Sequence, residues 1–237
     1  MKTVSIKEYF NSISYDYQND QDNLKDILRL TKTRVDDTKE SFEFVYGMEQ
    51  TFFIKSLAEN ISAENFFEIG TGRGTSCYAL SLLDKIKNIT TVDIVPHIQK
   101  KYEAINFKPA IVSNLDLYEL IQIPQKEKIN FKHVSDYEKI VEDFSNSFDL
   151  CFIDGNHSDY DVIKSDFNTC LKLIKNEGVL IWDDYVPGKF TVTEVVDDII
   201  NEYKFSSTLY ECAGHIFNNG IREPERGRGI VTMKITK

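Results

Sequence analysis

Apolar residues in the central part of the chain gather in five short stretches, each four to seven residues long. They cover residues 66–69, 89–95, 129–134, 148–153 and 179–182. Between most of these stretches, apolar residues recur at the three- and four-residue spacing of an amphipathic helix. Short strands that alternate with helices are typical of βαβ units, whose parallel strands are buried on both faces. The pattern therefore predicts an α/β fold around a mostly parallel sheet.

Six segments carry the apolar spacing of helices. They span residues 21–33, 48–60, about 75–86, 97–105, 158–178 and 192–203. Ser158 and Asp161 match a capping box at the start of the fifth helix, and the run 176–178, which contains a glycine, is expected to end it. Pro96 suits the start of the fourth helix, because proline is favoured at the first helical position.

Three segments have less regular patterns. Residues 1–20 are polar and rich in tyrosine, and we interpret them as a loose arm or short helix: a substrate lid, a dimer contact or surface decoration. Residues 106–130 are expected to form an insertion before the third strand. Two last strands are predicted at 207–212 and 229–236, and the loop between them contains His215, Arg222, Arg226 and Arg228.

The stretch at residues 65–76 combines a buried strand with a glycine-rich turn. After the strand, Gly70, Gly72 and Gly74 alternate with other residues. Glycines without a Cβ atom allow a tight turn and let a ligand lie directly on the backbone at the start of the following helix. Thr75 or Ser76 is expected to cap that helix.

Three classes of ligand commonly bind to a glycine-rich turn of this kind, and the sequence distinguishes between them. A phosphate-binding P-loop ends in Gly-Lys-Ser/Thr, and no lysine is present here. A dinucleotide fingerprint has the spacing G-x-G-x-x-G, whereas the third glycine here comes one residue early. The sequence E-I-G-T-G-R-G-T resembles the first motif of the class I S-adenosylmethionine-dependent methyltransferases. A strand–turn–helix without a ligand is the alternative interpretation.

That resemblance implies that Glu68 helps to hold the methionine amino group and that the turn passes close to the methionine. The candidate cofactor-binding residues of this segment are Glu68, Gly70, Thr71, Gly72, Gly74, Thr75 and Ser76. Asp93 ends the next strand, about 20 residues beyond the glycines, where a carboxylate can accept from both ribose hydroxyls. A solvated strand-end aspartate is the alternative.

Further cofactor contacts are implied by the resemblance alone. Ile94 follows the ribose-binding acid directly, and Ser135 and Asp136 end the third strand, where the family often has an acid near the adenine amino group. Asp154, which ends the fourth strand, is a further candidate contact. S-adenosylmethionine is therefore the predicted cofactor.

Three acids follow two neighbouring strands. Asp154 ends one strand, and Asp183 and Asp184 end the next, 29 residues further along the chain. One strand–helix–strand crossover takes about 30 residues, so the acids are expected to meet at one edge of the sheet. A divalent cation (Mg²⁺, Mn²⁺ or Ca²⁺) would relieve their repulsion, whereas separate capping and solvation is the alternative. Because consecutive strand residues point to opposite faces, Asp183 and Asp184 can share an ion only where the chain has left the strand.

The segments I-D-G-N-H-S-D-Y and V-L-I-W-D-D-Y resemble the metal-dependent O-methyltransferases, both the catechol and caffeoyl-coenzyme A type and the macrolide- and aminocoumarin-sugar type. The resemblance implies metal ligands at Asp154, Asp183 and Asp184. His157 falls three residues after Asp154, where the catechol enzymes carry a lysine base. A histidine, with an ordinary pKa of about 6.5, suits proton acceptance. Asp154 is the rival base, and an ordinary loop histidine is the alternative role for His157.

The composition of the chain indicates which binding partners are unfavourable and in which cellular compartment the protein is expected. The chain has 237 residues, of which 41% are hydrophobic, and a formal net charge of −10. This charge argues against nucleic acid and against an anionic membrane surface. The four cysteines are scattered without a C-x-x-C motif, which favours reduced core cysteines in a cytoplasmic protein. No stretch is apolar enough for a membrane span or a signal peptide.

These observations predict one methyltransferase domain over residues 1–237, with an N-terminal helical cap at 1–62 and an α/β core at 63–237. By resemblance, the fold is Rossmann-like, with a seven-stranded sheet in the order 3-2-1-4-5-7-6 and an antiparallel last strand. The predicted reaction is metal-dependent O-methylation of a small hydroxylated acceptor such as a sugar or catechol. Metal-free N- or O-methylation and a non-catalytic nucleotide-binding module are the alternatives, and a homodimer stays open.

Overall fold

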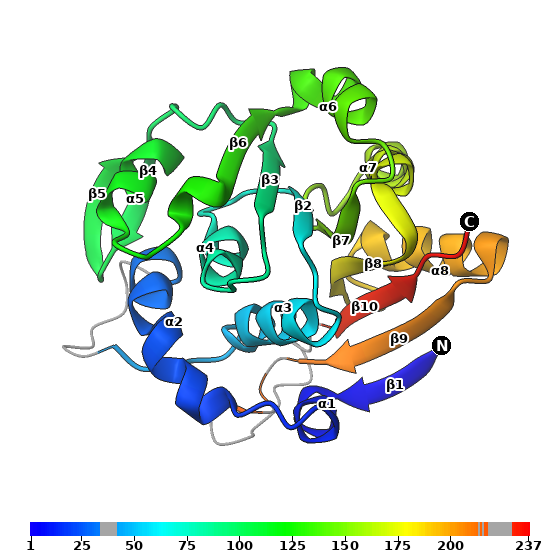
Figure 1. Ribbon diagram of the computed structural model, residues 1–237, viewed down its shortest axis with the longest axis horizontal. Coiled ribbons are helices and arrows are strands. Elements are labelled where there is room, and N and C mark those ends of the chain that lie inside the picture. The colour runs from blue at the N-terminus through cyan, green and yellow to red at the C-terminus, as the bar shows by residue number, and fades with distance from the viewer. Residues whose placement is uncertain (34–41, 213, 215, 218–228) are drawn as a thin grey trace.

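The computed structural model describes residues 1–33, 42–212, 214, 216–217 and 229–237. An eight-stranded sheet in the order β1-β9-β10-β8-β7-β2-β3-β6 forms its centre, and β4 and β5 form a separate two-stranded sheet (Figure 1). The strands are β1 (Lys2–Ser5), β2 (Asn65–Ile69), β3 (Asn88–Asp93), β4 (Lys101–Ile105), β5 (Lys108–Val112), β6 (Ile129–His133), β7 (Phe148–Ile153), β8 (Ile174–Tyr185), β9 (Ser206–Glu211) and β10 (Gly229–Lys234). The helices are α1 (Ile6–Ser12), α2 (Tyr17–Thr31), α3 (Glu49–Asn60), α4 (Thr75–Ser81), α5 (Asn114–Leu120), α6 (Tyr137–Phe144), α7 (Tyr160–Leu173) and α8 (Thr191–Tyr203), with single 3₁₀ turns η1 (Lys126–Lys128) and η2 (Val134–Asp136).

Seven of the eight strands follow the predicted order. Strands β6, β3, β2, β7, β8, β10 and β9 correspond to 3-2-1-4-5-7-6, and β10 is antiparallel to both of its neighbours. The eighth strand, β1, pairs in parallel with β9, from Lys2 opposite Thr208 to Ser5 opposite Glu211. The interpretation of residues 1–20 as a loose arm or short helix was therefore wrong for their first residues. Four residues are too few for a periodic signal, and this strand forms because β9 offers an unpaired edge.

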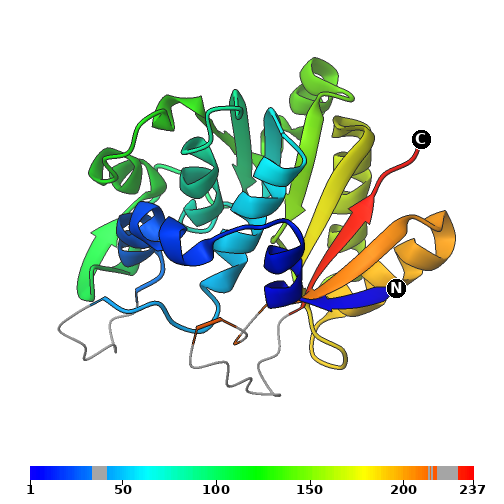
Figure 2. The ribbon, with the colours of Figure 1, turned by 60° about the horizontal axis from the view of Figure 1, so that its bottom comes forward.

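Helices cover both faces of the sheet. Successive strand residues point to opposite faces, so that in β2 Phe66 packs into one hydrophobic core and Phe67 into the other. The first core lies beneath α1 to α4 and the second beneath α6, α7 and α8 (Figures 1 and 2). This mixed, mostly parallel sheet between two helical layers confirms the predicted Rossmann-like α/β fold class.

The segment predicted as a helix at 97–105 contains no helix, and its last five residues are the first strand of a β-hairpin, so that prediction was wrong. Strands β4 and β5 pair antiparallel and are joined by Asn106 and Phe107, whose φ angles are 50° and 66°. Two-residue turns with positive φ match the twist of antiparallel strands, and asparagine adopts this conformation readily. The predicted insertion at 106–130 therefore begins with the turn of this hairpin and continues through β5, α5 and η1.

The fifth predicted helix, now α7, begins and ends at other residues than expected. Asp159, and not Ser158, caps its N-terminus by accepting two backbone N–H groups. The helix ends at Leu173, and β8 begins directly at Ile174. Residues 176–178 therefore lie within a strand and do not end the helix.

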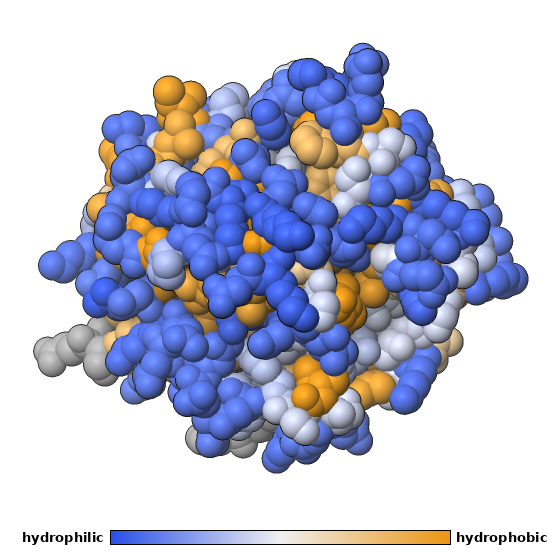
Figure 3. Space-filling model, viewed as in Figure 1, coloured by the Kyte–Doolittle hydropathy of each residue, from blue (hydrophilic) through white to orange (hydrophobic). Residues whose placement is uncertain are grey.

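Few large apolar side chains of the described residues are exposed. In the parts of the chain that the structure describes, no helix is long and apolar enough to cross a lipid bilayer. The face drawn in Figure 3 is mostly hydrophilic, and its apolar side chains gather in small separate groups. Among the described residues, Ile98, Tyr102 and Ile111 are large apolar side chains that are exposed on or beside the hairpin.

Candidate active site

The three glycines after β2 serve different structural purposes. Gly70 has φ +94°, and a Cβ atom there would lie 1.9 Å from the backbone oxygen of Asp154. Gly72 has φ +53°, and its Cβ position opens into free space. Gly74, in the left-handed conformation, occupies the N-cap of α4 without a side-chain cap, so neither Thr75 nor Ser76 caps the helix. The turn thus lies against β7 on one side and leaves its middle glycine open to a ligand.

Glu68 lies beneath this turn and is only 2% exposed. Its Oε2 accepts hydrogen bonds from Thr91 Oγ1 at 2.6 Å and from Cys77 Sγ at 3.0 Å. The hydroxyls of Thr91 and Thr71 lie 2.7 Å apart, which connects the carboxylate to the glycine turn. Burial raises the pKa of Glu68 to about 7. In this arrangement Glu68 supports the turn from within, and a contact with methionine stays a prediction.

Arg73 fastens the same turn to the N-terminal helices and the hairpin, which the sequence interpretation missed. Its guanidinium donates to the backbone oxygen of Leu30 at 2.7 Å, of Thr33 at 3.1 Å and of Ala104. The Arg73 Nε atom also lies 3.7 Å from Glu103 Oε2. The Arg73 side chain, which lies between Gly72 and Gly74 in the sequence, therefore holds α2 and β4 beside the turn.

A cavity of about 520 Å³ opens where β2, β3 and β7 end. Five of the predicted cofactor-binding residues line it: Gly70, Gly72, Asp93, Ile94 and Asp154. Ile94 is 75% exposed, so an apolar wall of this cavity faces solvent. Outside the lining lie Glu68, Thr71, Gly74, Thr75, Ser76, Ser135 and Asp136. The part of the turn that follows Gly72 therefore supports the cavity without facing it.

At the end of β6, the residues on either side of the predicted pair line the cavity. Asp136 accepts the backbone N–H of His133 at 3.1 Å, and the Ser135 hydroxyl lies 2.9 Å from His133 Nδ1. These bonds close the 3₁₀ turn and involve Asp136 Oδ2 and the Ser135 hydroxyl. Val134 and Tyr137 line the cavity instead.

Asp93 is held between two loops at the end of β3. Its Oδ2 accepts the backbone N–H of Gly72 at 3.2 Å, and its Oδ1 accepts that of Val95 at 2.9 Å. The carboxylate thus lies beside the open glycine of the turn and lines the cavity. Its two oxygens are oriented before any ligand arrives.

The acid pair at the end of β8 lies in a β-bulge. Trp182 faces Val231 of β10 and Tyr185 faces Gly229, so that Asp183 and Asp184 lie opposite the single residue Ile230. Asp184 has φ +54°, and Trp182 and Tyr185 both pack in the second hydrophobic core. An extra residue between two side chains on the same face turns both acids away from that core. The bulge thus turns both acids to the side of β8 away from that core, although only Asp184 joins the cluster of ligand-type side chains.

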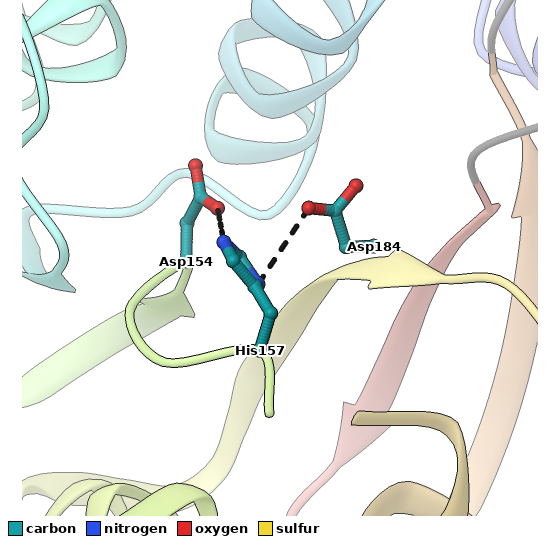
Figure 4. Close-up of side chains that lie close together, drawn as sticks. All are labelled: Asp154, His157 and Asp184. Carbon is teal, nitrogen blue, oxygen red and sulfur yellow. Dashed lines mark ion pairs between the residues drawn. The ribbon is translucent and has the colours of Figure 1, made fainter. Parts of the chain in front are cut away.

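Asp154, His157 and Asp184 come together at this edge of the sheet (Figure 4). His157 Nε2 lies 3.9 Å from Asp154 Oδ1, and His157 Nδ1 lies 3.6 Å from Asp184 Oδ2. Burial raises the pKa of Asp154, as do the charges of Asp183 and Asp184. Of the predicted metal ligands, Asp183 acts on Asp154 through its charge but is not among the clustered side chains.

A family model described as a methyltransferase domain matches residues 67–185, about half of the chain. The matched segment contains the glycine turn, the cavity lining and the acids at the ends of β7 and β8. The chain belongs to the methyltransferase-domain family. This confirms the predicted S-adenosylmethionine-dependent methyltransferase at the level of family and fold.

Solved structures share the fold of this methyltransferase. The O-methyltransferase from Bacillus cereus in complex with S-adenosylhomocysteine is 17% identical, with a TM-score of 0.58 over 92% of this chain and 96% of that one. The O-methyltransferase TomG from Streptomyces achromogenes, involved in tomaymycin synthesis and in complex with S-adenosylmethionine, is 16% identical, with a TM-score of 0.58 over 97% and 95%. A similarity in sequence alone is found with an uncharacterized protein of Acanthamoeba polyphaga mimivirus. It is 26% identical over 180 residues, which is 70% of this chain and 75% of that protein.

The side chains of this methyltransferase fit a divalent cation. One ligand atom each from Asp154, His157 and Asp184 lies within 4.8 Å of the other two. Ligands about 2.0–2.6 Å from one ion lie at most about 5 Å apart, so small movements would bring all three to a shared ion. Carboxylates suit Mg²⁺ and Mn²⁺, and an imidazole favours transition metals.

The remaining polar residues noted between the last two strands, His215, Arg222, Arg226 and Arg228, lie outside the described residues.

Proposed function

We propose that this methyltransferase methylates a hydroxyl group of a small acceptor, such as a sugar or catechol, with the help of a divalent cation. One observation carries the proposal: Asp154 belongs both to the lining of the cavity and to the Asp154–His157–Asp184 cluster. An acceptor oxygen held at the cluster would therefore lie next to a methyl donor held in the cavity. The O-methyltransferases that share the fold support the same reaction class.

In this proposal the cavity holds S-adenosylmethionine. Asp93 accepts from the ribose hydroxyls with its oriented oxygens, and Gly72 leaves room for the donor beside the backbone. Glu68 and Thr71 maintain the shape of the turn that carries Gly72. Asp154 and Asp184 would hold Mg²⁺, or Mn²⁺ or Ca²⁺ in its place, and Asp183 would add negative charge.

A cation held by Asp154 and Asp184 would supply Lewis-acid chemistry, which lowers the pKa of an acceptor hydroxyl. His157, with 37% of its side chain exposed, is open to the acceptor and takes the hydroxyl proton. Asp154 is the rival base. The acceptor oxygen forms a bond to the methyl carbon while the carbon–sulfur bond of the sulfonium breaks, which leaves S-adenosylhomocysteine. Holding both reactants in line contributes much of the acceleration.

The test combines a panel of acceptors with control of the metal. Hydroxylated sugars and catechols are incubated with methyl-labelled S-adenosylmethionine, and transfer is measured with Mg²⁺, with excess EDTA, and after Mg²⁺ or Mn²⁺ is added back. We expect transfer to an oxygen that stops in EDTA and returns with the metal. Transfer at full rate in EDTA would show metal-free methylation, and cofactor binding without transfer to any acceptor would favour a non-catalytic module.

His157 can be assigned as base or ligand by the same assay. As a base, His157→Ala should lower turnover at least about a hundredfold and leave Mn²⁺ affinity within about threefold. Loss of Mn²⁺ binding in this variant would make His157 a ligand and leave Asp154 as the base. Tyr160→Phe, at a half-buried position three residues away whose hydroxyl donates to Asp198, is the matched control.

We also propose that the protein works in the cytoplasm as a single domain, with the N-terminal segment 1–62 as a cap on the core at 63–237. All four cysteines are free and buried, which is compatible with a reducing compartment. Arg73, which connects the glycine turn to α2, supports a cap that is continuous with the core.

A further inference from the structure

A buried acid on α7 takes no part in the proposed chemistry. Asp166 is 6% exposed and lines the same cavity as Asp93. Its Oδ1 accepts a hydrogen bond from the hydroxyl of Tyr137 at 3.3 Å, and no described residue donates to Oδ2. Burial raises the pKa of Asp166 to about 6, so at neutral pH it is a carboxylate with acceptor capacity to spare.

Two neighbours hold this carboxylate in position. Tyr137 begins α6 and also lines the cavity, and burial raises the pKa of its hydroxyl, which therefore stays a donor. Gly155 leaves the space that Asp166 needs, because a Cβ atom there would lie 3.3 Å from Asp166 Oδ2. The acid is therefore fixed from two sides, as expected for a residue that orients a ligand.

The surroundings of Asp166 suit a flat aromatic base. The walls that Ile94, Val134 and Val162 contribute are apolar, and Ile94 directly follows Asp93 in the chain. If Asp93 holds the ribose, the base attached to that sugar enters this apolar part of the cavity. Asp93 also acts electrostatically on Tyr137, which indicates that the sugar end and the Tyr137–Asp166 pair are neighbours.

A carboxylate in an apolar cavity accepts hydrogen bonds and repels other acceptors. Adenine has an amino group at position 6, a donor, whereas hypoxanthine has a carbonyl oxygen there, an acceptor. The acid expected to meet this amino group, Asp136, does not line the cavity, and its Oδ2 accepts the backbone N–H of His133. We propose that Asp166, positioned by Tyr137, accepts a hydrogen bond from the 6-amino group of the cofactor and selects adenine over 6-oxopurines.

The test compares two nucleosides that differ at this one group. Binding of S-adenosylhomocysteine and S-inosylhomocysteine to the wild-type protein is measured by calorimetry at pH 7.5. A charge-assisted hydrogen bond corresponds to a preference of about ten- to a hundredfold for the adenosyl compound. Asp166→Asn carries both a donor and an acceptor, so the preference should fall to within about threefold. Tyr137→Phe, which frees the carboxylate, should give an intermediate ratio.

Asp161→Asn provides the matched control, because Asp161 is an exposed acid of the same helix that does not line the cavity. It should keep the wild-type ratio. Equal affinity of the wild type for both nucleosides would overturn the inference. So would an Asp166→Asn variant that binds both compounds more weakly by the same factor, since that result marks a structural role. The inference rests on the cofactor and not on the metal or acceptor, and failure of the wild type to bind S-adenosylhomocysteine would contradict the cofactor assignment as well.

Discussion

The two halves of the candidate site are constructed differently. The glycine turn is held by short hydrogen bonds and backbone contacts: Glu68 to Thr91 at 2.6 Å, Arg73 to Leu30 at 2.7 Å, and Gly70 against the backbone of Asp154. The acid cluster is held by longer approaches of 3.6 and 3.9 Å around His157. The residues of the turn are therefore in direct contact, whereas the side chains of the cluster lie far enough apart to receive the proposed cation. Substitutions should accordingly affect folding and cofactor binding at the turn, and turnover at the cluster.

The largest effect is expected at the cluster. Asp184→Asn should lower methyl transfer at least about a hundredfold, because the acceptor loses both its orientation and its lowered pKa. Cofactor affinity should stay within about threefold of the wild type. Asparagine tolerates the positive φ of 54° at this position, so the bulge should persist. Steady-state kinetics and calorimetry check both expectations, and a parallel loss of cofactor binding would contradict the separation of the two halves.

At the turn, substitution of one glycine should mainly reduce stability, and substitution of the other should mainly reduce cofactor binding. Gly70→Ala should destabilise the fold by about 2–4 kcal/mol, since its Cβ would meet the Asp154 backbone at 1.9 Å. A Cβ atom at Gly72 meets no atom within 4 Å, so Gly72→Val should cost about 1–2 kcal/mol, mainly through its positive φ angle. It should nevertheless abolish cofactor binding by filling the open cavity. Urea denaturation and ligand titration measure the two quantities, and full cofactor affinity in Gly72→Val would remove the turn from the binding site.

Asp93 lies between these cases, because it has both a structural and a binding role. Asp93→Ala should raise the cofactor dissociation constant about tenfold or more, since a charge-assisted acceptor is lost. Asp93→Asn keeps one acceptor oxygen, which can accept the N–H of either Gly72 or Val95, and should lose less. The ratio of the two constants by calorimetry is the readout. An unchanged constant in both variants would make Asp93 an ordinary solvated acid.

The smallest effect concerns the pH dependence of stability. The pKa of Glu68 is raised by burial from 4.5 to about 7. Between these two pH values, the folded state therefore holds a proton that the unfolded chain has released. Stability from this group is complete below about pH 4.5 and falls as pH rises through 7, by an amount of roughly 1–3 kcal/mol. Glu68→Gln should reduce this fall between pH 5 and 8 in chemical denaturation. An identical pH profile in the variant would show that Glu68 is ionised in the folded protein.

Local patterns were sufficient for the parts of the site that are made of consecutive residues. The strand, the glycine turn and the strand-end acid Asp93 each depend on a few neighbours, and all were located from the sequence. The bulge at Asp183 and Asp184 was not, because it depends on how β8 pairs with β10, more than 40 residues later. Residue spacing along one strand contains no information about the register with another.

Asp166 had a signal in the sequence that was overlooked. It falls three residues after Ile163 and four before Cys170, on the apolar stripe of its helix, where an unpaired acid is costly. A carboxylate on a buried helical face therefore indicates a partner. That the partner is Tyr137 of α6 depends on the packing of two helices, which spacing cannot provide.

One measurement tests most directly the proposal that a divalent cation occupies the Asp154–His157–Asp184 cluster. Mn²⁺ is titrated into the protein saturated with S-adenosylhomocysteine, and free Mn²⁺ is followed by electron paramagnetic resonance. We expect one bound ion per chain in the wild type and in the Asp161→Asn control, and at least about tenfold weaker binding in Asp184→Asn. Equal binding in all three proteins, or no bound ion in the wild type at millimolar Mn²⁺, would contradict the claim.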